Sequence, residues 1–138
     1  MCYIDLMDRV QKAFDAAKEA RSRAYAPYSH YQVGAAFLLP GEETVYSGCN
    51  VENASYGASV CAERTALFRI IADRGRTKPE QLVVVTASSP AEVPCALCLQ
   101  VLAEFCDDDF RIHLANAYGI EQSLTLKDLL PRPFRLSP

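Results

Sequence analysis

The sequence lacks the features that mark several protein classes. It has no run of about 18 apolar residues, so we expect no membrane-spanning helix. Acidic residues occur early in the N-terminal stretch, where a secretory signal would be basic and then apolar. The 14 Lys and Arg residues are outnumbered by 17 Asp and Glu, whereas proteins that bind polyanions usually have a basic balance. We therefore expect a cytoplasmic protein that acts on a small molecule and binds neither nucleic acid nor membrane.

The 138 residues, half of them apolar, are enough for one domain spanning residues 1–138. Apolar periodicity predicts helices over residues 4–24, 60–71 and 95–106, and strands over residues 33–39, 44–50, 82–87 and 111–115. The first two strands should form an antiparallel hairpin, and residues 123–130 a short strand or turn entering a helix that Pro131 ends. This order predicts an α/β fold in three layers, with a central mixed sheet between helices.

Three of the six cysteines occur in two short clusters, Cys61 and the pair Cys95 and Cys98. At the start of a helix, residues i and i+3 lie on one face, so both thiols of the pair can bind one ion. Three protein ligands leave one coordination position open, which is typical of a catalytic zinc ion. The remaining Cys2, Cys49 and Cys106 are expected to be free thiols.

The alternative is a structural zinc site, with a fourth ligand from one of the two histidines, His30 or His113. Three thiolates around a dication carry an excess negative charge. The predicted helix starts at Cys61 and Cys95, together with Arg64, can stabilise that charge. Glu63 is not needed as a ligand and is placed to move a proton.

The two clusters, residues 61–66 (CAERTA) and 94–98 (PCALC), closely resemble the zinc-dependent cytidine deaminases of the small three-cysteine type. The resemblance continues through residues 26–36, 48–56 and 129–134. It implies a cytidine deaminase-like fold and one Zn²⁺ per subunit, bound by Cys61, Cys95 and Cys98. It also implies hydrolysis of cytidine and 2'-deoxycytidine to the uracil nucleosides and ammonia in pyrimidine salvage.

In the mechanism that the resemblance implies, zinc-bound hydroxide attacks C4 of the base while Glu63 transfers a proton to N3 and then to the departing amine. Members of this type with short chains are homotetramers whose sites are completed across subunits. The substrate-binding residues that the resemblance implies are Asn50 and Glu52 on the ribose 3'-hydroxyl, Tyr31 packed on the nucleoside, Ala54 and Tyr56 in a loop lining a neighbour's site, and Phe134 closing over the base.

One residue of the motif departs from the family pattern. The family usually has Arg directly after the last zinc cysteine, and this chain has Leu99. Loss of that positive charge leaves more of the charge compensation to Arg64. Two alternatives follow from this departure: a deaminase for another aminopyrimidine nucleoside compound, or a catalytically degenerate zinc-binding module of the same fold.

Overall fold

The chain is arranged around a five-stranded mixed sheet. The computed structural model describes residues 3–137, so Cys2 and the two ends of the predicted 1–138 domain lie outside the described residues. Its elements are α1 (Tyr3–Arg21), β1 (Gly34–Leu38), β2 (Val45–Cys49), the 3-10 helix η1 (Tyr56–Ala58), α2 (Ala62–Arg74), β3 (Gln81–Val85), α3 (Ala96–Phe105), β4 (Arg111–Asn116), β5 (Gly119–Thr125) and α4 (Leu126–Leu129). No helix within residues 3–137 is both long and apolar enough to span a bilayer.

The strand order in the sheet is β2-β1-β3-β4-β5. The hairpin of β1 and β2 is antiparallel, as the short connection between them predicted. β1 also pairs antiparallel with β3, β3 pairs parallel with β4, and β4 pairs antiparallel with β5. The sheet is therefore mixed, and its apolar strands β1 and β3 lie in its interior, where both faces are covered.

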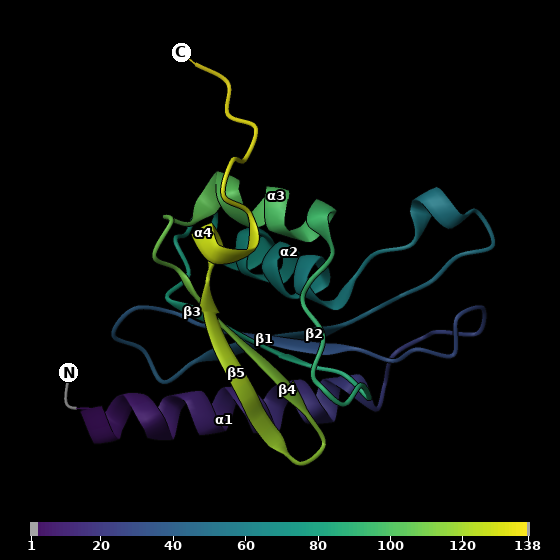
Figure 1. The fold of residues 1–138 in the computed structure, drawn as a ribbon, viewed down its shortest axis with the longest axis horizontal. Coiled ribbons are helices and arrows are strands. Elements are labelled where there is room, and N and C mark those ends of the chain that lie inside the picture. Colours follow the sequence, from purple (N-terminus) through teal and green to yellow (C-terminus); the bar gives the residue numbers. More distant parts are fainter. Residues whose placement is uncertain (1–2, 138) are drawn as a thin grey trace.

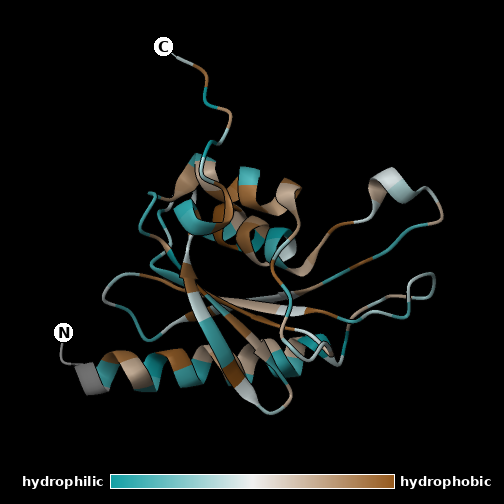
Figure 2. Ribbon diagram, viewed as in Figure 1, coloured by the Kyte–Doolittle hydropathy of each residue, from teal (hydrophilic) through white to brown (hydrophobic). Residues whose placement is uncertain are grey.

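Helices cover the two faces of the sheet in separate layers (Figure 1), which confirms the predicted α/β architecture. α1 packs on one face, where Phe14 and Ala17 contact Leu38 and Val83 in one buried cluster. α2, α3 and α4 lie on the other face, above a larger core that includes residues such as Leu67 and Leu102. Figure 2 shows hydrophilic and hydrophobic residues alternating along α1, as expected for a helix with one buried side.

Several boundaries differ from the sequence prediction, among them the end of α2, which reaches Arg74 instead of residue 71. The first helix ends at Arg21 instead of residue 24, because a turn over Ser22 and Arg23 precedes an isolated bridge from Tyr25 to Val51. The last strand, β5, begins at Gly119, four residues before the predicted start. β5 is an edge strand with exposed residues along most of its length, so it lacks the apolar signal of a buried strand.

Close approach of α2 to the sheet depends on a glycine in β2. A Cβ atom added at Gly48 would lie 2.5 Å from the backbone nitrogen of Ala66 in α2. This spacing is shorter than any normal carbon contact, so only glycine allows α2 to lie at this depth on β2. The N-terminus of α2 is thereby fixed next to the ends of β1 and β2.

Candidate metal centre and substrate pocket

The three predicted zinc ligands lie together at the starts of two neighbouring helices. Cys61 is the N-cap of α2 and Cys95 is the N-cap of α3, and neither side chain caps its own helix. Cys98 lies one turn into α3 and is buried. The two helix N-termini therefore direct their positive dipole ends toward the thiols, which lowers the energy of a thiolate there.

The spacing of the sulfur atoms fits one tetrahedral zinc ion. The three Sγ atoms lie within 4.8 Å of one another, and those of Cys61 and Cys95 are 3.8 Å apart. A zinc ion with bonds of about 2.3 Å to sulfur requires tetrahedral ligands about 3.8 Å apart. Among residues 3–137, the group includes neither histidine. The ring nitrogens of His113 are hydrogen-bonded to Ser123 and Gln81 instead, each at 2.7 Å.

Arg64 is the cation beside the thiols, as predicted. Its Nη2 atom donates a hydrogen bond to Cys61 Sγ at 3.6 Å. A hydrogen bond from Cys98, with further bonds from Arg64 and Cys95, lowers the pKa of Cys61 to about 5. The bond to Cys61, together with burial, raises the pKa of Cys98. The cluster is therefore ready to hold a thiolate before any metal binds, which favours metal binding because zinc requires deprotonated ligands.

Glu63 is a buried carboxyl group next to this cluster. It follows Cys61 by two residues in the first turn of α2, and its residue is 4% exposed. Burial, and then the negative charge of Cys61, raise the pKa of Glu63 to about 7. A carboxyl group of this kind can hold or release a proton near neutral pH.

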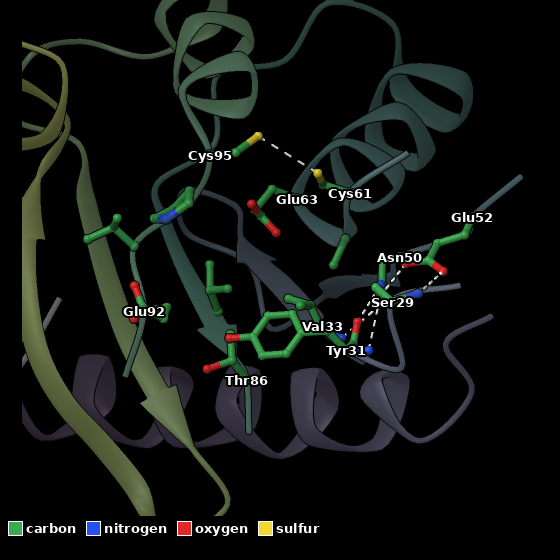
Figure 3. A pocket seen from close by; sticks show the side chains of 14 residues that line it. Ser29, Tyr31, Val33, Asn50, Glu52, Cys61, Glu63, Thr86, Glu92 and Cys95 are labelled. Atoms are coloured by element: carbon green, nitrogen blue, oxygen red, sulfur yellow. Dashed lines mark hydrogen bonds between the residues drawn. The ribbon is translucent and has the colours of Figure 1, made fainter. Parts of the chain in front are cut away.

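A pocket of about 250 Å³ opens beside the thiols and Glu63. This is close to the lower end of ligand pockets, about 300–1,000 Å³, and suits a small molecule. In Figure 3, the Glu63 carboxylate lies below Cys61 and Cys95, and Tyr31 extends across the pocket from the side of Asn50 toward Thr86. The pocket therefore joins the metal-binding cluster to three of the predicted substrate-binding residues, Tyr31, Asn50 and Glu52.

Hydrogen bonds orient both polar residues of the predicted ribose-binding pair. Asn50 accepts a bond from the backbone nitrogen of Val33 at 2.8 Å and donates one to the carbonyl of Tyr31 at 2.8 Å. Glu52 accepts bonds from the backbone nitrogens of Tyr28 and Ser29, at 2.9 and 3.1 Å, and from the Ser29 hydroxyl. The side-chain and backbone bonds from Ser29 lower the pKa of Glu52, so the carboxylate stays ionised and remains an acceptor.

Three of the predicted substrate-binding residues do not line the pocket of their own chain. Tyr56 is the first residue of η1 and Ala54 lies just before it, and η1 extends away from the body of the molecule in Figure 1. Phe134 is 70% exposed on the C-terminal segment, where the side chain of Gln100 bonds its backbone nitrogen and carbonyl at 3.0 and 2.8 Å. Within one chain, this clamp holds the segment on α3 and away from the pocket.

Sequence reasoning missed several of the pocket walls. Thr86 directly follows β3, and Glu92 and Val93 belong to the loop between β3 and α3. Their position could have been inferred, because a loop that ends at a metal-binding cysteine must pass beside the metal. Glu92 and Val93 are exposed loop residues without helical or strand periodicity, and Thr86 is a buried polar residue at the end of an apolar strand, so no sequence pattern marks them as pocket residues.

The mixed sheet, the open three-thiol cluster and the buried carboxyl group together define a zinc-dependent hydrolytic enzyme. Residues 7–114 match the family model of the cytidine and deoxycytidylate deaminase zinc-binding region. The chain is 42% identical over 125 residues to a cytidine deaminase of Sporosarcina psychrophila, covering 91% of this chain and 90% of that protein. A cytidine deaminase of Halalkalibacterium halodurans is 44% identical over 128 residues, covering 93% and 95%.

The fold is similar to that of the crystal structure of cytidine deaminase from Burkholderia pseudomallei. The TM-score is 0.84 at 42% sequence identity, and the match covers 90% of this chain and 98% of the other. The chain therefore belongs to the zinc-dependent cytidine deaminase family, with Zn²⁺ as its cofactor.

Proposed function

We propose that this protein hydrolyses the exocyclic amino group of cytidine and 2'-deoxycytidine, giving uridine or 2'-deoxyuridine and ammonia, as a step of pyrimidine salvage. The observation that carries the proposal is the buried carboxyl group of Glu63 beside three clustered thiols, at one end of a pocket that Asn50 and Glu52 also line. The relatives described above are named cytidine deaminases.

Cys61, Cys95 and Cys98 would hold the zinc ion. Bound zinc supplies Lewis acidity, which makes water a nucleophile near neutral pH. Glu63 would accept one proton from the attacking water and deliver it to N3 of the base, and would then carry the second proton of the same water to the departing amine. Its pKa of about 7 suits both directions of transfer. Arg64 would stabilise the thiolate of Cys61 through the bond that it already donates.

The opposite end of the pocket would bind the sugar. The ionised carboxylate of Glu52 can accept a hydrogen bond from the ribose 3'-hydroxyl, and the oriented amide of Asn50 can donate one to it. A 3'-phosphate would meet the negative charge of Glu52 and be rejected. The ring of Tyr31 would pack on the nucleoside between these residues and the base.

We also propose that the enzyme is a cytoplasmic homotetramer whose sites are completed across subunits. Tyr56, beside Ala54, and Phe134 are 75% and 70% exposed, so these aromatic rings are available to a neighbouring copy of the chain. The five described cysteines, Cys49, Cys61, Cys95, Cys98 and Cys106, are all free, which fits a reducing compartment.

Purified protein mixed with cytidine tests the proposal through the loss of absorbance as uridine forms. Glu63→Gln should keep zinc and lower kcat by about 100-fold or more, because the proton carrier is lost. Glu43→Gln is the matched control, since Glu43 is an exposed residue of the β1–β2 turn with an 82% exposed side chain. A chelator should abolish turnover and added zinc should restore it; activity that survives zinc removal would refute the mechanism.

A panel of substrates separates the remaining alternatives. Turnover of another aminopyrimidine nucleoside in place of cytidine would indicate a shifted specificity, which the replacement of an Arg by Leu99 beside Cys98 motivates. Stoichiometric zinc with no turnover of any cytosine nucleoside would instead indicate a binding module. Single-stranded DNA should not be deaminated.

A further inference from the structure

Ser88, in the loop between β3 and α3, has all three of its polar groups bonded. Its backbone nitrogen donates to Thr86 Oγ1 at 3.2 Å, and its carbonyl accepts from Asn116 Nδ2 at 3.3 Å. Its hydroxyl shares a hydrogen bond of 2.7 Å with the Tyr31 hydroxyl. Thr86 and Asn116 are 3% and 2% exposed, so two of these partners are fixed in the interior. Ser88 is therefore held firmly where its hydroxyl meets that of Tyr31, a residue that lines the pocket.

The same loop is bound a second time on its outer side. Glu121 of β5 accepts a hydrogen bond from the backbone nitrogen of Ala91 at 2.7 Å and another from Asn116 Nδ2. The hairpin of β4 and β5 thus anchors the loop at Ser88 and at Ala91. The residues that follow directly, Glu92 and Val93, form a wall of the pocket.

The opposite wall has fewer constraints of its own. Tyr31 follows an exposed turn in which His30 has a φ of 58°, and its residue is 36% exposed. Its backbone is bonded by Asn50 and by the Ser29 hydroxyl, but within the described part of the chain its ring hydroxyl is hydrogen-bonded only to Ser88. Without that bond, the ring would be freer to rotate about its side-chain torsions.

We propose that Ser88 is a positioning residue for the substrate. Its hydroxyl ties the Tyr31 ring to the anchored β3–α3 loop, so that the two walls of the pocket keep a fixed separation before the nucleoside binds. A pocket that is ordered in advance loses less conformational entropy on binding, so the effect appears in substrate affinity. As far as it concerns a nucleoside, the inference rests on the proposed function.

Two single substitutions and their combination test the bond. Ser88→Ala and Tyr31→Phe each remove one hydroxyl, and each should raise KM for cytidine about 3- to 10-fold with kcat within about twofold. The double variant should be no worse than either single variant, because all three lack the same bond. Ser89→Ala is the matched control: the neighbouring side chain is exposed and makes no hydrogen bond among residues 3–137.

The inference would be overturned if Ser88→Ala left KM unchanged. It would also be overturned if the double variant raised KM by the product of the two single effects. A KM that rises together with a large fall in kcat would overturn it too, because general unfolding of the site would then be the cause.

Hydrogen exchange decides the positioning independently of catalysis. The backbone amides of residues 29–33 should exchange faster in Ser88→Ala than in the unmodified protein, because Tyr31 loses its bond to the anchored loop, and Ser89→Ala should leave them unchanged. Equal exchange in all three proteins would overturn the inference. If the unmodified protein fails to deaminate cytidine, the proposed function is refuted, and the exchange result still decides whether Ser88 positions Tyr31.

Discussion

Replacing Gly48 by alanine would test whether the contact between β2 and α2 positions the metal centre. The added Cβ atom would lie 2.4 Å from Thr65 Oγ1 and 2.5 Å from the backbone nitrogen of Ala66. Thr65 cannot turn aside without loss, because its hydroxyl is bonded to the carbonyls of Cys49 and Ala62, at 2.8 and 2.9 Å. Helix α2 must therefore move about 1 Å away from β2 to restore normal contact.

The movement should affect stability and catalysis together. Overpacking of this kind costs about 1–3 kcal/mol of unfolding free energy. α2 carries Glu63 in its first turn and Cys61 as its N-cap, so both move with the helix. A displacement of about 1 Å in a reacting group can lower turnover by about 100-fold. We expect Gly48→Ala to lose stability and most of its activity.

Urea unfolding at matched protein and zinc concentrations measures the first effect, and cytidine turnover the second. Gly57→Ala is the control for stability, because a Cβ atom there meets nothing within 4 Å and the backbone φ is not positive. Its unfolding free energy should stay within about 0.5 kcal/mol of the original. If Gly48→Ala matched the original in both measurements, the depth of α2 on β2 would not position the site.

Two further predictions concern charged groups. Arg64→Ala should weaken zinc retention about 10- to 100-fold in competition with a chelator, because Cys61 loses its hydrogen bond. Arg69 lies on the exposed side of the same helix, so Arg69→Ala should leave zinc retention unchanged. Burial, and then Arg111, lower the pKa of His113 from 6.5 to about 4. As pH falls, His113 is therefore protonated in the unfolded chain before it is protonated in the folded chain. The free energy of unfolding that is present above pH 6.5 is lost between pH 6.5 and pH 4 for this reason. The loss of unfolding free energy should be about 1–2 kcal/mol after allowance for solvent access, and it should be smaller in His113→Gln. Urea unfolding at several pH values measures both losses. Equal losses in the two proteins would refute this role of His113.

The metal centre was predictable from sequence because its residues are local. Cys95 and Cys98 are one helical turn apart, and Cys61, Glu63 and Arg64 occupy the start of another helix. Short-range spacing fixes which side chains share a face, and apolar periodicity marks where each helix begins. The structure had only to bring two helix starts together, which the layered α/β order already implied.

The outer walls of the pocket could not be predicted in the same way. Ser88 and Glu121 act through hydrogen bonds to Tyr31 and to Ala91, which lie 57 and 30 residues away along the chain. Such pairings have no periodic signal, and an exposed edge strand such as β5 has little apolar content to mark it. Tyr31 was recognised as a pocket residue, but the partner of its hydroxyl became visible only in the folded chain.

The fold also explains how the site accommodates Leu99. Its residue is 4% exposed and belongs to the core beneath α2 and α3, so this position contributes packing to the helix that holds Cys95 and Cys98. A guanidinium buried there would need new hydrogen-bond partners in an apolar cluster. The positive charge at the thiols instead comes from Arg64 and from the two helix starts. Arg64 Nε is itself buried with no partner among residues 3–137. A strong bond to the thiolate is needed to offset that cost. The charge balance of the centre therefore depends on Arg64, and it depends on Arg64 more because Leu99 stands where the family usually has Arg.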